Sequence, residues 1–410
     1  MRPELSSQTE TESRVSRRAF LAGAGTAAGT LAAGGVLGAS LGYAGAHAAD
    51  MARVVPTTVP FFGAHQAGIA TAPQKNGVFL AFTLKPGVTR ERFAGVMRLV
   101  TDDAARLTQG EPALPDNDPQ LARDPGRLTV TVGFARTLFD KLGLTGAIPA
   151  GFADIPNYPI DQLNEDYCGG DLVVHIGSDD ALSLSHAMRQ VSRTLLSFAT
   201  PRWTQRGFVG DAGRNPTTGT ARNLFGQLDG TVNPGRFGLP FDDYVWARNV
   251  GWYTGGTMLV VRRIAMNLPT WDKLDESDKE NVIGRRLETG APLTGSREQD
   301  VPDLDAVDDV NLPIIDAGAH VRRAAPSSAS ERFLRRPLNF DDGLLPDGQP
   351  NAGLLFAAYA ANIETQYLPV QNRVAQHDLL NKWTTTIGSA TFVIPPGCQP
   401  GGFIGEGLLS

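Results

Sequence analysis

The chain has 410 residues, which exceeds one typical domain and is enough to bury a sizeable core. Hydrophobic residues make up 41% of the sequence and charged residues 20%, as in an ordinary soluble globular protein. The formal net charge of -6 argues against nonspecific binding to nucleic acid or to an anionic membrane surface. Two cysteines, Cys168 and Cys398, are too few for a disulfide framework, although a single bridge between them stays open.

The first fifty residues have the pattern of an export signal. Arg17 and Arg18 precede a long uncharged stretch rich in alanine and glycine, which ends in a small-x-small cleavage site at Ala46–Ala48. The arginine pair predicts the twin-arginine pathway and its export machinery as a partner, and the many glycines disfavour the alternative of a permanent membrane anchor. We therefore expect residues 1–48 to be a cleaved signal and the protein to reach the periplasm, the exterior of the cell envelope or the medium.

The segment after the signal predicts a ferredoxin-like order of elements. Apolar runs and alternating patterns predict strands, and amphipathic stretches with a period near 3.6 predict helices. The resulting order, β-α-β-β-α-β, is the ferredoxin-like pattern. The elements are a strand at 77–84, a helix at 90–107, strands at 128–132 and 171–176, a helix at 182–198 and a strand at 203–209.

The second half of the chain predicts a similar organisation with longer connections. Strands are expected at 256–261 and 354–360, and a helix at 363–376. Polar loops rich in proline and aspartate are expected at 294–313 and 341–351, and loops of this length usually serve a function or cover a site. We therefore predict an α+β architecture in which two ferredoxin-like halves with antiparallel sheets enclose one cavity. The halves are placed at residues 60–235 and 236–410.

Three separated segments carry residues that could perform chemistry, but each is ordinary alone. Residues 225–234 read Phe-Gly-Gln-Leu-Asp-Gly-Thr-Val-Asn-Pro, and an Asp-Gly pair is most often a plain turn. Residues 319–322 contain His320, and a lone histidine is more often structural than a ligand. Residues 332–337 contain Arg335 and Arg336, and an arginine pair is usually solvated surface.

Together and in this order, the three segments resemble the dye-decolourising peroxidase family. Gly226-x-x-Asp229-Gly230 is similar to the family's Gly-x-x-Asp-Gly motif, and His320-Val-Arg is similar to its His-Ile-Arg motif. The arginine pair resembles its Arg-Arg-Gly motif, with Pro337 in place of the glycine. Matching segments run from Phe62–Ile69 to Gly402–Glu406, so the resemblance covers nearly the whole chain after the signal. The signal suits the exported branch of the family, which includes deferrochelatase/peroxidase proteins.

The resemblance implies one haem b per chain and peroxidase activity. It makes His320 the proximal iron ligand, Asp229 the acid/base that moves a proton between the oxygens of hydrogen peroxide, and Arg335 the group that stabilises cleavage of the O–O bond. Dyes, phenolics or other one-electron donors are the expected reductants. The residues expected to bind the cofactor are Asp229, Gly230, Thr231, His320, Ala325, Pro326, Ser327 and Arg335.

Several alternatives stay open at this point. Arg336 is the second candidate for the distal arginine, because Pro337 departs from the family pattern. Asp378 is a candidate acceptor for the second ring nitrogen of His320, and a helix-end or surface carboxylate is the favoured alternative. Bulky donors could transfer electrons through Tyr359 or Trp383, although either residue could simply pack in the core.

The function itself also has alternatives. Deferrochelatase activity, which removes iron from haem during iron uptake, would add iron-uptake proteins as partners. A non-catalytic haem-binding protein is disfavoured by Asp229 and Arg335, because a carrier needs no proton shuttle. We also expect a homo-oligomer and no nucleic-acid partner.

Overall fold

The computed structural model describes residues 57–235 and 240–410. The expected signal at 1–48 lies outside the described residues. Within the described ranges, no helix is long and apolar enough to cross a membrane. The described part of the chain combines helices with one antiparallel sheet system, as expected for the α+β class.

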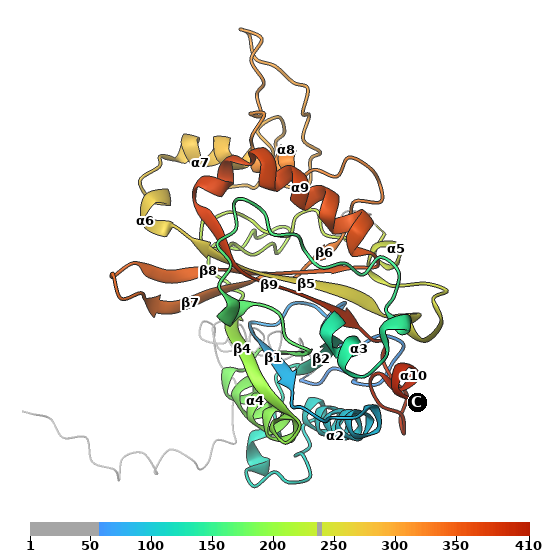
Figure 1. The fold of residues 1–410 in the computed structure, drawn as a ribbon. Coiled ribbons are helices and arrows are strands. Elements are labelled where there is room, and N and C mark those ends of the chain that lie inside the picture. The colour runs from blue at the N-terminus through green and yellow to red at the C-terminus, as the bar shows by residue number, and fades with distance from the viewer. Residues whose placement is uncertain (1–56, 236–239) are drawn as a thin grey trace, which may run out of the picture. The chain divides into compact units, whose positions relative to one another are not determined.

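The N-terminal sheet contains the four strands that the sequence predicts, each displaced by only a few residues. Its hydrogen-bonded order is β2-β3-β1-β4, and every neighbour is antiparallel. Helices α2 and α4 cover one face of this sheet (Figure 1). Thr89 and Asp180 cap their N-termini by accepting hydrogen bonds from backbone N–H groups in the first turn. The elements are β1 (Asn76–Leu84), α2 (Arg90–Thr108), β2 (Thr129–Phe134), β3 (Leu172–Ser178), α4 (Ala181–Leu196) and β4 (Ala199–Phe208).

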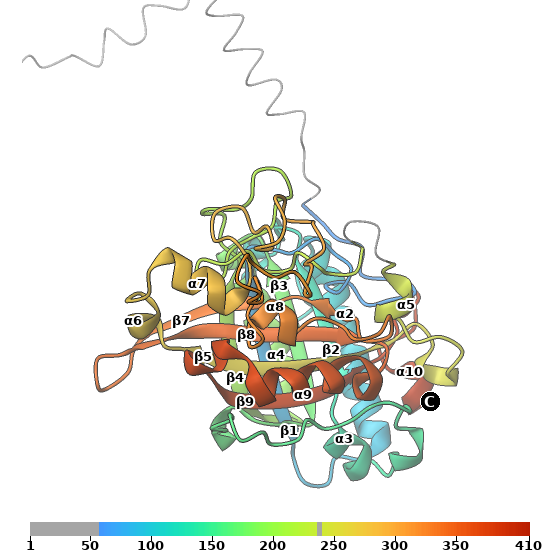
Figure 2. The same cartoon turned by 90° about the horizontal axis from the view of Figure 1, so that it is seen from above.

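The C-terminal sheet has the order β9-β5-β8-β7, and the short strand β6 pairs with the free end of β8. Helices α7, α8 and α9 lie on one side of it (Figures 1 and 2). The elements are β5 (Thr257–Met266), α7 (Glu276–Ile283), α8 (His320–Arg323), β6 (Leu334–Arg335), β7 (Leu338–Leu344), β8 (Pro350–Ala360), a π-helical turn (Ile363–Tyr367), α9 (Leu368–His377) and β9 (Thr384–Ile394).

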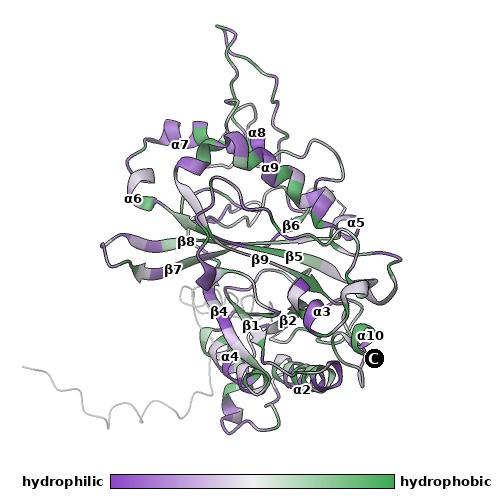
Figure 3. Cartoon of the chain, viewed as in Figure 1, coloured by the Kyte–Doolittle hydropathy of each residue, from purple (hydrophilic) through white to green (hydrophobic). Residues whose placement is uncertain are grey.

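The two sheets join into a ring of strands, because β5 pairs with both β8 and β9. The seams between the sheets are narrow: Phe134 pairs with Val393, and Phe208 pairs with Asn339. Alternate residues of each strand face opposite sides, so Phe79 packs inside the ring while Val78 packs under the helices. Strand β5 is accordingly buried over most of its length, whereas β4 is mostly exposed and hydrophilic (Figure 3).

Two consecutive arginines on β5 reinforce the connection between the halves. Arg262 forms a buried ion pair with Asp161, at 2.6 Å between Nη2 and Oδ1. Arg263 donates from Nε to Gln205 of β4 at 2.6 Å. Its guanidinium also lies 4.2 Å from the ring centroid of Tyr167, close enough for a cation–π contact. These side-chain contacts therefore stabilise the association of the two halves, which the two narrow seams join through few backbone hydrogen bonds.

The prediction of a loop at 341–351 is wrong. Strand β7 continues to Leu344 and β8 begins at Pro350, so only the tip between them is a turn. The acidic residues are compatible with a strand because they lie at its exposed end, where Asp342 also accepts from Arg263 at 3.0 Å. In contrast, residues 294–313 form no helix or strand, as predicted.

The two cysteines are unpaired thiols in the structure. Cys398 is buried near the C-terminus, and burial raises the pKa of its thiol to about 11. Burial also raises the pKa of Cys168. Neither thiol has the environment of a reactive cysteine, which requires a depressed pKa.

Candidate active site

A cavity of about 590 Å³ lies between the C-terminal sheet and helices α8 and α9. Alternate residues of the strands form its floor, since Arg262, Ile264 and Met266 of β5 point the same way, as do Leu354 and Phe356 of β8. Its volume is within the usual range of ligand pockets, roughly 300–1,000 Å³. The remaining wall residues include Ile160, Thr384 and Thr386, Val370 and Val374 of α9, and Val301, Pro302 and Leu304 of the 294–313 loop.

His320 enters this cavity from the first position of α8. Its Nδ1 lies 2.6 Å from Oδ2 of Asp378, whose side chain is fully buried. Among the described residues, no hydrogen bond engages its Nε2. Burial lowers the pKa of His320, but the Asp378 carboxylate outweighs burial and raises it above its ordinary value. Asp378 is therefore the acceptor for the second ring nitrogen. It also lies at a helix end, as the C-cap of α9, but the alternative of a surface carboxylate is wrong.

Asp229 and Arg335 also line the cavity, and they face each other. Nη1 of Arg335 lies 3.1 Å from Oδ1 of Asp229, with the two side chains 23% and 15% exposed. The contact is an ion pair without hydrogen-bond alignment, because Oδ1 of Asp229 is buried and accepts no aligned hydrogen bond from the described residues. The carboxylate can therefore still accept a proton or a hydrogen bond from a ligand.

Asp229 is carried by a small hairpin, residues 215–231, which we call the distal hairpin. The N–H of Asp229 donates to the carbonyl of Ala221 at 2.9 Å, and Leu228 pairs with Arg222 in an isolated antiparallel bridge. The next residue, Gly230, has φ +103, a conformation that favours glycine. The glycine after the aspartate thus turns the chain where the carboxylate enters the cavity.

Asn233 is a site residue that sequence reasoning missed. Its side chain accepts from the N–H of Arg335 at 3.0 Å and donates to the carbonyl of the same residue at 2.8 Å. This two-point contact fixes strand β6 beside the distal hairpin. The sequence could have indicated this residue, because Asn233 lies in the Thr-Val-Asn-Pro segment that follows the Gly-x-x-Asp-Gly motif.

Arg336 points away from the cavity, because adjacent residues of a strand face opposite sides. Its guanidinium donates to the carbonyls of Ile69 and Thr71 and, at 3.3 Å, to Oε1 of Gln74. Burial lowers the pKa of Arg336 to about 10. Arg335, and not Arg336, is therefore the arginine that faces Asp229.

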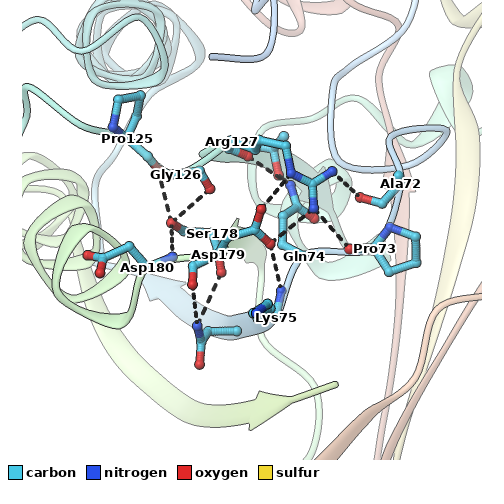
Figure 4. Close-up of polar contacts among 12 residues, drawn as sticks. Ala72, Pro73, Gln74, Lys75, Pro125, Gly126, Arg127, Ser178, Asp179 and Asp180 are labelled. Atoms are coloured by element: carbon cyan, nitrogen blue, oxygen red, sulfur yellow. Dashed lines mark hydrogen bonds and ion pairs between the residues drawn. The ribbon is translucent and has the colours of Figure 1, made fainter. Parts of the chain in front are cut away.

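The segment that holds Arg336 is itself fixed by a second arginine (Figure 4). Arg127 contacts Asp179 through two nitrogens, at 2.5 and 3.0 Å, and also donates to the carbonyls of Ala72 and Pro73. Gln74 donates to the carbonyl of Arg127 at 3.1 Å. These contacts lock residues 72–74 against the N-terminal sheet and so support the neighbours of strand β6.

The other expected cofactor residues divide into two groups. Thr231, Ala325 and Pro326 line the cavity. Gly230 and Ser327 are not among its lining residues; Ser327 instead donates to Glu331 at 2.6 Å and shapes the turn after α8.

The two candidate electron-transfer residues, Tyr359 and Trp383, do not line the cavity. Tyr359 is fully buried inside the ring of strands, with its Oη 3.4 Å from Nδ1 of His175, so it is no surface donor. Trp383 packs edge-on against Trp271, with ring centroids 5.4 Å apart.

Two family models together cover most of the chain. The model described as Dyp-type peroxidase, N-terminal, matches residues 66–209, and the model described as Dyp-type peroxidase, C-terminal, matches residues 220–399. The chain belongs to the Dyp-type peroxidase family. It is therefore a haem peroxidase, an oxidoreductase that acts on peroxide.

Individual relatives agree with this membership. A dye-decolorizing peroxidase of Thermobifida fusca is 36% identical over 96% of this chain and 97% of its own. A deferrochelatase of Escherichia coli K12 is 31% identical over 85% and 87%. A solved DyP-type peroxidase from Cellulomonas bogoriensis is 44% identical, covers 86% of this chain and 98% of its own, and superposes with a TM-score of 0.82. Ferric DtpA from Streptomyces lividans is 36% identical, with coverages of 86% and 97% and the same TM-score.

The cavity of this Dyp-type peroxidase fits haem in three respects. Its walls are mainly apolar, and it presents one imidazole, His320, whose Nε2 is available for a ligand bond. The described residues contain no group of three or more His, Cys, Asp or Glu side chains that could hold a bare metal ion. A metal that arrives within a porphyrin needs only one axial protein ligand.

Proposed function

We propose that this protein is an exported peroxidase in which His320, Asp229 and Arg335 carry the reaction. The observation that supports this proposal is the meeting of two polar pairs in one apolar cavity. One pair is His320 with Asp378, and the other is Asp229 with Arg335. When bound, haem supplies an iron that reacts with hydrogen peroxide and passes the oxidising equivalents on to one-electron donors.

His320 would hold the iron through Nε2. Its Nδ1 proton is donated to Asp378, which fixes the orientation of the ring and makes Nε2 a stronger donor to the metal. Asp378 is itself held in place because its Oδ1 accepts from the N–H of Leu380 at 2.9 Å. Two hydrogen bonds therefore fix the Asp378 carboxylate beside His320.

Asp229 would accept a proton from one oxygen of hydrogen peroxide and return it to the other as the O–O bond breaks. Arg335, at 3.1 Å, places its guanidinium beside the carboxylate that would carry out this cycle. The same guanidinium stabilises negative charge on the departing oxygen. Removing such a preorganised donor typically costs about 2.7–4 kcal/mol of barrier in other enzymes.

The substrates are hydrogen peroxide and a small-molecule or dye reductant. Deferrochelatase activity is a second candidate, supported by the 31% identity to the E. coli protein of that name. The two activities have different products, since a deferrochelatase releases iron and leaves the porphyrin intact. Quantifying free iron and iron-free porphyrin after turnover with haem as the substrate would distinguish them.

We further infer that residues 60–235 and 236–410 are ferredoxin-like halves. This division is supported by the strand order of both sheets, which is fourth-first-third-second along each half. We retain the proposals that residues 1–48 direct twin-arginine export, that the protein acts outside the cytoplasm and that it forms a homo-oligomer. Cell fractionation of wild type beside Arg17→Lys/Arg18→Lys tests the first two, and light scattering tests the third.

The deciding experiment compares peroxide turnover of haem-loaded wild type with three variants. His320→Ala should lose haem or its normal ligation, which the Soret band reports. Asp229→Ala and Arg335→Ala should retain haem but react slowly with hydrogen peroxide. Asp341→Ala, at an exposed strand position, serves as the control. Wild-type rates in both distal variants would refute the proposed roles.

A further inference from the structure

Glu298 is a buried carboxylate beside the active site that the mechanism above does not use. Glu298 is only 2% exposed, and it lines the cavity from the 294–313 loop. All four side chains that donate to it come from the distal hairpin. The donors are Nδ2 of Asn215 at 2.9 Å, Oγ1 of Thr218, Oγ1 of Thr220 at 2.6 Å and Oγ1 of Thr231 at 2.8 Å.

These contacts join the two arms of the hairpin on either side of Asp229. Thr220 lies next to Ala221, whose carbonyl accepts the N–H of Asp229. Thr231 follows Asp229 by two residues on the other arm. One oxygen of Glu298, Oε1, accepts from both threonines, so it fixes their separation and thereby the turn between them.

The hydrogen bonds occupy both oxygens of the Glu298 side chain. Oε1 and Oε2 each accept two hydrogen bonds, which occupies the roughly four lone-pair positions of a carboxylate. The distal hairpin therefore holds this side chain at both oxygens. Glu298 joins Asp229, Asp300, Glu331 and Asp378 as an acidic residue of the cavity wall.

A partly buried arginine, Arg285, lies between Glu298 and the Asp229–Arg335 pair. Nη1 of Arg285 donates to the backbone carbonyls of Glu298 at 2.9 Å and Gly290 at 2.7 Å. Burial lowers the pKa of Arg285, Glu298 opposes this shift, and Arg335 adds to it, so Arg285 lies within the electric field of both. Asp229, Arg335, Arg285 and Glu298 thus place two acidic and two basic side chains near one another on the cavity wall.

We propose that Glu298 is a positioning residue for the peroxidase reaction. It holds both arms of the distal hairpin so that Asp229 faces the cavity, and it offsets the charge of Arg285 so that Arg335 stays paired with Asp229. The proposal rests on the proposed function of Asp229 and Arg335. It predicts that the charge of Glu298, and not only its volume, supports the reaction with peroxide.

The test is Glu298→Gln, which keeps the shape and removes the charge. We expect kcat/KM for hydrogen peroxide to fall by about 10- to 100-fold, because small misplacements of reacting groups have effects of this size. The KM for the reducing dye and the Soret position should stay unchanged, because His320 is untouched. Cyanide binding to the ferric protein should also slow, since hydrogen cyanide must give up a proton in the distal pocket. Glu298→Asp, which retains the charge, should recover part of the rate.

Glu280→Gln is the matched control, because Glu280 is also buried and paired. It accepts from the N–H of Leu287 at 2.8 Å and contacts Arg286 at 2.8 Å, but it does not line the cavity. The control should lower Tm without changing kcat/KM for peroxide. If Glu298→Gln does not fold, Thr231→Val removes one of its contacts to the hairpin and should slow the same step.

Two outcomes would overturn the proposal. One is wild-type peroxide and cyanide kinetics in folded Glu298→Gln, or in Thr231→Val if that variant has to replace it. The other is an equal loss of kcat/KM in Glu280→Gln, which would make the effect structural. Asp229→Ala separates this failure from failure of the proposed function. A slow Asp229→Ala beside a fast Glu298→Gln rejects only the positioning role, whereas a fast Asp229→Ala rejects the mechanism itself.

Discussion

Replacing Asp378 by asparagine tests the proximal side of the site. The change keeps an oxygen that can accept from Nδ1 of His320, which lies 2.6 Å away, but removes the negative charge. Asparagine can also preserve the second contact of this side chain, in which Oδ1 caps the N–H of Leu380. The variant should therefore fold, and the change is confined to the strength of one buried hydrogen bond.

The expected loss of haem affinity follows from the strength of the hydrogen bond between His320 and Asp378. Hydrogen bonds to charged groups contribute about 1.5–3 kcal/mol, against about 1 kcal/mol for neutral pairs. Losing the charge should thus weaken the support of His320 by about 1–2 kcal/mol, which corresponds to roughly a 5- to 30-fold change in an equilibrium. Loss of a partner behind a metal-binding histidine typically costs about 10- to 100-fold in affinity or activity, so the two estimates agree.

The assay is titration of haem-free protein with haem, followed through the Soret band, for wild type and Asp378→Asn. We expect weaker haem affinity in the variant. Asp116→Asn is the control, because Asp116 pairs with buried His186 at 2.8 Å and does not line the cavity. It should reduce stability and leave haem affinity unchanged. Equal haem affinity for Asp378→Asn and wild type would refute the role of Asp378.

Three further predictions concern the supports of the site. Burial acts to raise the pKa of Asp179, but Arg127 outweighs it and keeps that pKa below its ordinary value, so this stabilisation is present at neutral pH and lost as pH falls through the depressed pKa. Asp179→Asn should therefore cost about 1–2 kcal/mol of unfolding free energy in urea at pH 7 and almost nothing in strong acid; a constant difference would contradict this. Arg336→Met should lower Tm strongly, because it leaves buried carbonyls without donors, yet turn over peroxide faster than Arg335→Met; the reverse order of rates would exchange their roles. Cys398 should react slowly with maleimide until the protein unfolds, because its pKa of about 11 keeps it a thiol, and rapid labelling of the native protein would disprove this.

Much of the N-terminal half could be predicted from the sequence, because its strands and helices have clear periods. The last strand, Thr384–Ile394, was missed, because its first half is threonine, glycine and serine, with too few apolar residues to reveal alternation. The hairpin around 341–351 was missed for the opposite reason. Its aspartates suggest a loop, whereas in the fold they lie at the solvent-exposed end of a strand.

The site residues show a different limit of sequence reasoning. His320, Asp229 and Arg335 become meaningful only through the family motifs, because no local period relates segments so far apart. Asp378 stands in a segment that resembles the family and was named as a candidate, whereas Glu298 belongs to no motif. A glutamate in a polar loop normally suggests solvent exposure, and only the folded chain shows that four side chains surround this one.

The position of β9 in the ring ties cofactor retention to completion of the chain. This strand pairs with β5 along its whole length and also makes the only residue pair, within the described ranges, that joins β2 to the C-terminal sheet. It further contributes Thr384 and Thr386 to the cavity. A polypeptide that stopped before Thr384 would therefore lack one of the two neighbours of β5, one seam and part of the cavity wall. We therefore expect full haem affinity only after β9 has been synthesised and has paired with β5.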